Sequence, residues 1–368
     1  MKILLLGGCA EMAVPIIPRL LSEEDVELVT LADLNEEKAR RLAGVNPRLA
    51  AARMDATDRA AVVELMQQHD LSISYIGPFY RFERPMAQAA IEAGRHYVSI
   101  CDDFDAYLDV ITLDDTAREK GVKILTGFGN SPGITQILAK KGYLSMARPQ
   151  RINVHWCAGS DEAVGPSNLA HLFHIFTGTT LQWLDGHEVR VKTGRGKKVV
   201  EFPPPIGRNP VYCTGHAESV SLPRNLPGLT EVTLHGGVKP PYIVTLVKLL
   251  SALRLTATHK RRSALARFFH RIEDRFAAAG IDKSVGRVDV YGFDEEGREQ
   301  HRVYTYVGHI AEITSIPCLT AALRLGRGRW DHLPGGVYAP ERIVEDPDDF
   351  LQELIARGVE IHLEPAVS

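Results

Sequence analysis

The fold of this chain of 368 residues is decided by its first strand and turn, where residues Lys2–Ala13 read KILLLGGCAEMA. An apolar run leads into a turn of small residues, and a second apolar run, Val26–Leu31, is followed by Asp33. A strand, a tight turn, a helix and a second strand with an acid at its tip form a dinucleotide-binding βαβ unit. The sequence therefore predicts a nucleotide-binding domain at its start.

The turn keeps only the first glycine of the Gly-x-Gly-x-x-Gly fingerprint. In the best register Gly8 makes the tight turn, while Ala10 and Ala13 occupy the second and third glycine positions. The methyl group of Ala10 lies where a pyrophosphate approaches the backbone, but the N–H groups of a helix N-terminus still attract one. We predict cofactor contacts from the turn, with a Rossmann-like fold that has lost its nucleotide as the alternative; the contacting residues are Gly7, Gly8, Ala10, Glu11 and Met12.

Asp33 lies 25 residues after Gly8, where a ribose-binding acid belongs. A carboxylate at this position accepts a hydrogen bond from the 2′-hydroxyl of NAD and repels the 2′-phosphate of NADP. The sequence therefore favours NAD over NADP as cofactor.

Length and composition bound the class of protein. A chain of 368 residues with 45% hydrophobic and 24% charged residues is an ordinary globular protein of about two domains. The net charge of −3 gives no reason to expect nucleic acid or a membrane as partner. We expect a cytoplasmic protein without a signal peptide, because Met1 leads straight into a strand and the five scattered cysteines lack CxxC spacing.

The pattern of strands and helices predicts an α/β fold in three parts. Residues 1–130 alternate six short apolar runs with helical patterns, which predicts a Rossmann-type, doubly wound parallel sheet. Residues 131–312 show β-like alternation broken by prolines and glycines, which predicts an α+β domain for substrate binding and dimerisation on a largely antiparallel sheet. Residues 313–368 return to a helical pattern, and we expect these helices to pack back on the Rossmann domain.

The elements expected in the first part are short. The predicted strands are Lys2–Leu6, Val26–Leu31, Ala50–Met54, Ser72–Ile76, Tyr97–Ile100 and Lys123–Leu125. The predicted helices are Val14–Leu21, Glu36–Leu42, Arg59–Gln68, Pro85–Ala93 and Leu108–Glu119, with Ile313–Leu325 and Pro347–Arg357 in the tail.

The carboxyl ends of the predicted parallel strands carry further polar residues at the expected ligand crevice. Asp55 either contacts the adenine side of the cofactor or forms a turn. Asp102 and Asp103 either act as an acid pair, one with a raised pKa, or cap a helix starting near Phe104. We also expect cofactor contacts from Gly77 and Pro78, and cofactor or substrate-carboxylate contacts from Tyr80 and Arg81.

The stretch GFGNSPGIT, residues 127–135, resembles the saccharopine reductase and lysine 6-dehydrogenase superfamily. Further segments resemble this superfamily in the same order along the chain, namely 93–99, 156–160, 185–186, 202–207 and 335–341. The resemblance implies an NAD(P)-dependent enzyme that oxidises or reduces a C–N bond of an amino acid or polyamine, as a homodimer. Saccharopine reductases carry an Asp before the Pro-Gly of this turn, where this chain has Ser131, so saccharopine itself is a doubtful substrate.

The second part carries one cluster of groups suited to imine chemistry. His216 and Glu218 alternate along a segment predicted to be extended, so we expect them to face the same way, with His216 moving the proton. Arg224 would hold a substrate carboxylate, and Ser131 would contact the substrate. The alternative is a surface His–Glu pair with a loop arginine.

Two other patterns are given structural interpretations. His171 and His174 are three residues apart on a predicted helix, but without a third ligand nearby in sequence we predict no metal site. The run His259–Arg262, with Arg267, Arg271 and Arg275, predicts a solvent-exposed amphipathic helix, or else one that borders an acidic partner or subunit.

Together these patterns predict an NAD(P)-dependent dehydrogenase or reductase acting on CH–NH or CH–NH2 donors. Two alternatives stay open. One is a nucleotide-binding protein that senses without turnover, favoured by Ala10 and Ser131. The other is an enzyme that uses NAD transiently, as the related homospermidine synthases do.

Overall fold

The computed structural model describes residues 1–162, 165–271 and 281–363. Contacts between Cα atoms divide the chain into two units. The first unit comprises Met1–Gly129 and Thr314–Ile343, and the second comprises Asn130–Ile313 and Val344–Ser368. Among the described residues, no helix is both long enough and apolar enough to cross a membrane.

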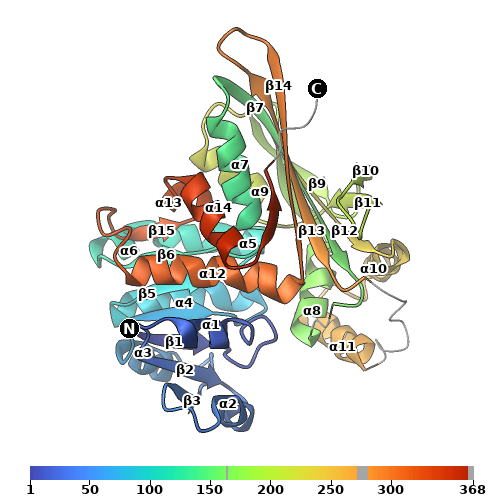
Figure 1. Cartoon of the computed structure of the whole chain (residues 1–368). Helices are drawn as coiled ribbons and strands as arrows, with labels where there is room; N and C mark the ends of the chain where they lie inside the picture. The colour runs from blue at the N-terminus through green and yellow to red at the C-terminus, as the bar shows by residue number, and fades with distance from the viewer. Residues whose placement is uncertain (163–164, 272–280, 364–368) are drawn as a thin grey trace. The chain divides into compact units, whose positions relative to one another are not determined.

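The first unit is built on a seven-stranded sheet in the order β15-β6-β5-β4-β1-β2-β3. Every pairing in this sheet is parallel, which confirms the predicted doubly wound sheet (Figure 1). The order of the first six strands is that of a Rossmann fold. The strands are β1 (Lys2–Leu6), β2 (Leu28–Asp33), β3 (Leu49–Arg53), β4 (Leu71–Ser74), β5 (His96–Ser99), β6 (Lys123–Leu125) and β15 (Gly336–Tyr338).

The helices of the first unit begin and end at polar caps and glycines. Asn35 accepts a hydrogen bond from the Lys38 N–H to cap α2, Asp58 caps α3 through the Ala61 N–H, and left-handed Gly94 ends α4. The helices are α1 (Ile16–Ser22), α2 (Glu36–Ala43), α3 (Arg59–Gln67), α4 (Phe79–Ala93), α5 (Phe104–Val110), η1 (Ile111–Leu113), α6 (Asp114–Glu119) and α13 (Pro340–Ile343).

Two helix predictions in this unit need correction. Helix α4 starts at Phe79 rather than at Pro85, and Pro85 lies inside it, where the proline lacks the N–H that would bond the carbonyl four residues back. The single helix predicted for Leu108–Glu119 is instead two short helices joined by η1.

A buried carboxylate ties α4 to the sheet of the first unit. Glu83 on α4 accepts hydrogen bonds from the Tyr97 hydroxyl (2.9 Å), the Ser99 hydroxyl (2.6 Å) and the Thr126 hydroxyl (2.8 Å). Burial raises the pKa of Glu83. A buried acid needs such donors, and these three come from β5 and the residue after β6.

The second unit is built on a nine-stranded sheet in which β12 and β7 are parallel and every other pairing is antiparallel. The prediction of a largely antiparallel sheet is therefore confirmed. Figure 1 shows β7, β13 and β14 as long strands side by side. The strands are β7 (Arg148–Gly159), β8 (Thr179–Leu184), β9 (His187–Lys192), β10 (Lys198–Glu201), β11 (Arg208–Cys213), β12 (Glu231–Lys239), β13 (Ser284–Phe293), β14 (Glu299–Gly308) and β16 (Glu360–His362).

The tail is shared between the two units, whereas the sequence analysis expected all of it on the Rossmann domain. Most of α12 (Ile310–Gly326), together with β15, belongs to the first unit. Helix α14 (Pro347–Ala356) contacts α7, and β16 pairs with β14, both in the second unit. The remaining helices of the second unit are α7 (Ile134–Leu144), α8 (Pro166–Ile175), α9 (Glu218–Asn225), α10 (Tyr242–Ala252) and α11 (His259–His270).

A row of alternating glycines and aromatic residues crosses the second sheet. The register pairs Gly236 of β12 with Trp156 of β7, Trp156 with Gly286 of β13, and Gly286 with Tyr306 of β14. A Cβ atom added to Gly236 would lie 2.2 Å from the Trp156 ring, and one added to Gly286 would lie 2.1 Å from the Tyr306 ring. Each ring therefore lies flat over the neighbouring glycine, which fixes its direction on the sheet.

We predict that Gly236→Ala destabilises the protein by about 1–3 kcal/mol, the usual cost of overpacking. In a Trp156→Leu background the same change should cost much less, because the clashing ring is gone. Urea unfolding of the four proteins in this double-mutant cycle measures both costs. Equal costs in the two backgrounds would contradict the row as described.

A second buried acid, Glu162 of the second unit, caps the first residue of α12. The carboxylate of Glu162 accepts hydrogen bonds from the Ile310 N–H at 2.9 and 3.0 Å and from the Ser284 hydroxyl at 3.0 Å. Ile310 is the first residue of α12. Burial raises the pKa of Glu162 from 4.5 to about 7, against opposing effects of these donors and His309, and Asp282 adds to the rise.

Because the pKa of Glu162 is higher in the folded than in the unfolded protein, its stabilising contribution is present below about pH 4.5 and is lost as pH rises through about 7. We predict that Glu162→Gln removes this part of the pH dependence. The check is the difference between the urea midpoints of wild type and variant from pH 4 to 8. Parallel curves across this range would contradict the prediction.

Candidate functional site

The turn after β1 needs its first two glycines. Gly7 has a φ of +72°, and the N–H groups of Gly7 and Gly8 both donate to the Ala32 carbonyl, at 2.8 and 3.2 Å. A Cβ atom added to Gly8 would lie 2.9 Å from the Leu31 Cα. The turn therefore lies directly on the end of β2, as the first glycine of a dinucleotide fingerprint requires.

The residues after Gly8 form a longer turn than the sequence predicts. The chain winds through successive turns from Gly7 to Pro15, and α1 begins only at Ile16, not at Val14. Ala13 is fully buried, as expected for the packing position, and Ala10 and Met12 are half-buried while Glu11 is exposed. These residues therefore lie in a loop ahead of the helix, because Pro15 restricts the backbone there.

Asp33 holds the turn and the end of β2 together. Its Oδ2 accepts a hydrogen bond from the Cys9 N–H at 3.2 Å and its Oδ1 accepts one from the Asn35 N–H at 2.9 Å. The Lys38 Nζ donates to the Cys9 carbonyl at 2.9 Å, which brings an ammonium group to the same loop. Burial and the Asp33 charge raise the pKa of the Cys9 thiol to about 11, so this cysteine is an inert neighbour.

Asp55 forms a turn at the end of β3. Its Oδ1 accepts hydrogen bonds from the Thr57 N–H at 2.9 Å and the Thr57 hydroxyl at 2.6 Å, which lower the pKa of Asp55. This is the turn-forming alternative of the sequence analysis. The side chain is exposed, so a contact with an adenine stays a prediction.

A carboxylate from the loop after β5 accepts a hydrogen bond from the start of α4, which follows β4. Asp103 is fully buried and its Oδ2 accepts a hydrogen bond from the N–H of Tyr80, the second residue of α4, at 3.0 Å. Helix α5 begins at Phe104 with Asp103 at its N-cap position, but the Asp103 side chain makes no capping hydrogen bond there and bonds α4 instead. Gly77 and Pro78 lead into α4, and the Arg81 guanidinium lies 4.8 Å from the Phe82 ring.

In the second unit, a buried acid joins the first turns of α7 and α9. Glu218 is fully buried at the first position of α9, where the positive end of the helix dipole stabilises a carboxylate. It accepts hydrogen bonds from the Ser131 hydroxyl and, at 2.8 Å, from the Thr135 hydroxyl. The Ser131 hydroxyl is therefore bound to a carboxylate from another segment, and its contact with a substrate stays a prediction.

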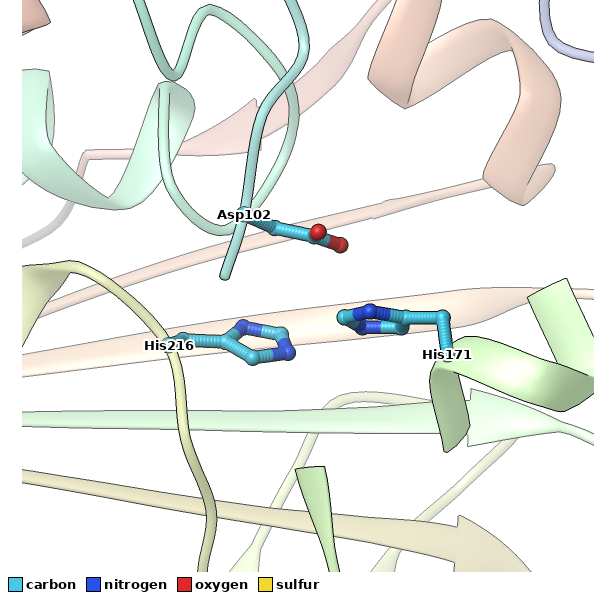
Figure 2. A group of neighbouring side chains, drawn as sticks. All are labelled: Asp102, His171 and His216. Atoms are coloured by element: carbon cyan, nitrogen blue, oxygen red, sulfur yellow. The ribbon is translucent and has the colours of Figure 1, made fainter. Parts of the chain in front are cut away.

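His216 is held in a layer of rings. Its imidazole stacks on Trp156 with 5.2 Å between ring centroids and 11° between planes. The centroid of the His171 ring lies 5.4 Å from that of His216, and the two rings are tilted. Figure 2 shows the two imidazoles facing one another, His171 from α8 and His216 from the loop before α9. The Asp102 side chain also drawn there belongs to the first unit. His171, which the sequence analysis set aside, is thus a neighbour of His216.

Two predictions about this segment need correction. His216 and Glu218 do not alternate along a strand, because Glu218 already begins α9. Arg224 lies on the same helix rather than in a loop, and its guanidinium donates to the Glu188 carboxylate at 2.5 Å and to the Val220 carbonyl. A substrate carboxylate at Arg224 would have to replace Glu188.

Sequence reasoning missed Thr135, Trp156 and Glu83. Thr135 carries no signal except its place four residues after Ser131, the spacing of one helical turn. Trp156 opens a family-like segment but acquires its role only from the register of β7 with its neighbours.

Comparison with known proteins supports the assignment of the first unit as a dinucleotide-binding domain. Residues 3–125 match the family model of the saccharopine dehydrogenase NADP binding domain. Saccharopine dehydrogenase (NADP+, L-glutamate-forming) of Schizosaccharomyces pombe is 28% identical over 141 residues, and that of Pyricularia oryzae is 29% identical over 113 residues. These matches span 38% and 31% of this chain, and only 30% and 24% of the relatives' own lengths.

Solved structures match over the whole chain. Saccharopine dehydrogenase (L-Glu forming) from Saccharomyces cerevisiae superposes with a TM-score of 0.74 at 16% identity, covering 100% of both chains. Homospermidine synthase from Legionella pneumophila, solved with NAD, superposes with a TM-score of 0.62 at 12% identity, covering 99% of this chain and 91% of its own. At these identities the likeness establishes the fold. The resemblance seen in the sequence is thus confirmed: residues 3–125 match the family model of the saccharopine dehydrogenase NADP binding domain, and the chain has the same fold as saccharopine dehydrogenase.

Proposed function

We propose that this protein is an NAD(P)-dependent oxidoreductase acting on the C–N bond of an amino acid or a related amine. The observation that carries the proposal is the Gly7–Gly8 turn, seated on β2 and bonded through Cys9 to Asp33, in a domain of the saccharopine dehydrogenase NADP-binding family. A bound nicotinamide dinucleotide would supply or accept the hydride. Gly8 fits the first position of such a turn, because an added Cβ atom would lie 2.9 Å from the Leu31 Cα. Ala10 carries a methyl group where the pyrophosphate approaches, and the backbone N–H groups of the turn would bind the phosphates.

The direct test has two stages. NADH and NADPH are first titrated while protein and cofactor fluorescence are followed. A panel of amino acids and diamines is then assayed at 340 nm with NAD and NADP. We expect binding of at least one dinucleotide and turnover of at least one amine; absence of binding by both would reject the enzyme and favour a fold that has lost its nucleotide.

We propose NAD as the preferred cofactor, although the matched family model carries NADP in its description. The support is the Asp33 carboxylate, which ends β2 where the adenosine ribose belongs and would repel a 2′-phosphate. Two cations lie along the same loop and strand end: Lys38, bonded to the Cys9 carbonyl, and Arg53, the register partner of Asp33 on β3. The choice between the two cofactors therefore depends on the one negative charge.

We predict that Asp33→Asn shifts the ratio of the NADH and NADPH dissociation constants toward NADPH by about tenfold, roughly 1.4 kcal/mol. Asparagine keeps an acceptor for the loop N–H groups but removes the repulsion, and Lys38 and Arg53 remain. Glu64→Gln is the matched control, since Glu64 is an exposed acid on α3 that lies outside the predicted cofactor contacts. An unchanged ratio in Asp33→Asn would remove Asp33 from the ribose site.

For the substrate side, we propose that Glu218 supplies the carboxylate that saccharopine reductases carry at the position of Ser131. The support is the hydrogen bond between the two side chains, which places an acid beside the Ser131 hydroxyl. Thr135 bonds the same carboxylate, so its position is fixed from two sides. His216, two residues earlier and stacked on Trp156, is the proposed proton carrier.

We predict that Glu218→Gln lowers kcat by about 100-fold, a typical value for loss of an acid or base, with dinucleotide dissociation constants unchanged. Adding Ser131→Asp to this variant should restore at least tenfold of the lost kcat, because the carboxylate returns one hydrogen bond away. Steady-state kinetics over pH 6–10 on the wild type and both variants measure this, with thermal unfolding as control. If the double variant is no faster than Glu218→Gln, the exchange of positions is wrong.

A second candidate is a synthase that uses NAD without net turnover. It is favoured by the structural match to homospermidine synthase over nearly the whole chain. Release of NADH during turnover with a single amine would exclude it, whereas product formation with constant absorbance at 340 nm would support it.

The proposal includes a cytoplasmic location and a homodimer. Five buried cysteines without disulfide bonds are typical of a reducing compartment. Light scattering coupled to size-exclusion chromatography tests the dimer.

A further inference from the structure

Helix α10 of the second unit is apolar on both its inner and outer sides. Its inner side packs Val244 and Val247 into a core shared with α8 and α11. A helix that is apolar all round is normally covered on every side. The outer side of α10 therefore calls for an explanation.

The outer side carries a continuous row of exposed apolar residues. Tyr242, Leu246, Leu249 and Leu253 follow one another at intervals of four, three and four, the spacing of one helix face. Leu249 and Leu253 are 55% and 61% exposed. Leu255, which follows α10, and Phe268 on α11 are exposed as well. We name these six residues the apolar row.

The segment that carries the apolar row has no acidic residue. From Lys239 to Arg271 the sequence contains no Asp or Glu, in a chain whose overall net charge is −3. The overall charge therefore conceals a strongly basic region. Its exposed cations are Arg254, Lys260, Arg261, Arg267 and Arg271, while Arg275 lies outside the described residues.

Further cations come from a neighbouring loop. Lys248, next to Leu249 on α10, is close enough to Gly194 that an added Cβ there would lie 3.1 Å from it. Arg195 and Lys197 follow in that loop, and burial together with their charges lowers the pKa of Lys248. Within the described part of the chain, Lys248, Arg195 and Lys197 form no ion pair with an acid, so the positive charge beside the apolar row is not neutralised by described neighbours.

We propose that the apolar row and its surrounding cations dock this protein on an anionic phospholipid membrane surface. An amphipathic helix with leucines on one side and Lys and Arg around them lies in the interface, with its apolar face among the headgroups and upper acyl chains. Each cation near an anionic surface adds to the attraction. The contact is peripheral, and it differs from the expectation from net charge that no membrane takes part.

Charge decides between this occupant and a second copy of the chain. A symmetric dimer through the apolar row would set the same cations against one another, which opposes association. An anionic bilayer offers both the negative charge and an apolar layer, and it accepts a helix ridge without a shaped groove. This argument does not depend on the proposed enzymatic function.

The test is co-sedimentation of the full chain with vesicles of phosphatidylcholine alone and of phosphatidylcholine with 30% phosphatidylserine. We expect binding to the anionic vesicles, weakened at high salt, and little binding to the neutral ones. Two variants remove the two parts of the surface: Leu249→Glu with Leu253→Glu, and Lys260→Gln with Arg267→Gln. The charge variant should weaken partitioning about 25-fold, at about fivefold for each cation.

Matched controls lie elsewhere on the molecule. Arg41→Gln with Lys120→Gln removes the same charge from exposed sites of the first unit, and Val199→Glu adds an acid at an exposed apolar residue of β10. Both controls should bind anionic vesicles within twofold of wild type. Circular dichroism and thermal unfolding establish that all variants fold.

Three results would overturn the proposal. The first is no binding of wild type to anionic vesicles, and the second is equal binding by the patch variants and their controls. The third is a dimer in light scattering that Leu249→Glu with Leu253→Glu converts to a monomer, since a second copy would then cover the apolar row. Loss of vesicle binding with unchanged dinucleotide binding separates this surface from the proposed enzyme site.

Discussion

The register of β12, β7, β13 and β14 is the constraint on which the second unit depends. Side chains alternate in direction along a strand, so a slip of one residue would turn Trp156 to the opposite face of the sheet. The present register seats Trp156 over Gly236 and Tyr306 over Gly286. Trp156 can then stack on His216, and the Tyr306 hydroxyl donates to Asn130 at the start of the unit. The pattern of glycines therefore determines where the chemical groups of the unit lie.

Buried glutamates with neutral hydrogen-bond donors recur in both units. Glu83 is held by three hydroxyl groups, Glu162 by a hydroxyl and a backbone N–H, and Glu218 by two hydroxyls. The donors of these bonds are hydroxyl and backbone N–H groups, not Lys or Arg side chains. Neutral donors bond the carboxylate oxygens but bring no positive charge to stabilise the ionised form. Burial therefore raises the pKa of Glu83 and Glu162. Glu162, whose pKa is raised to about 7, can therefore hold elements together and also change protonation near neutral pH.

Local pattern predicted most of the strands and helices of the first unit, because each of them is short and contiguous in the sequence. Six strands and the parallel arrangement follow from alternating apolar runs, and the importance of Gly8 and Asp33 follows from their spacing. The seventh strand, β15, could not be predicted, because its three residues gain their structure only by pairing with β6. The division of the tail between the units has the same cause. The position of such short segments is set by the strands with which they pair, which the local sequence does not show.

The sequence by itself determined the class of fold, the glycine turn after β1 and the place of Asp33 at the end of β2, since these depend on residues close together in the chain. Tertiary structure alone decided that Glu218 joins Ser131 and that His171 joins His216, because these pairs bring together distant segments. It also decided which apolar residues of α10 are left outside the core. A periodic pattern gives the faces of a helix, but only packing shows which face is covered.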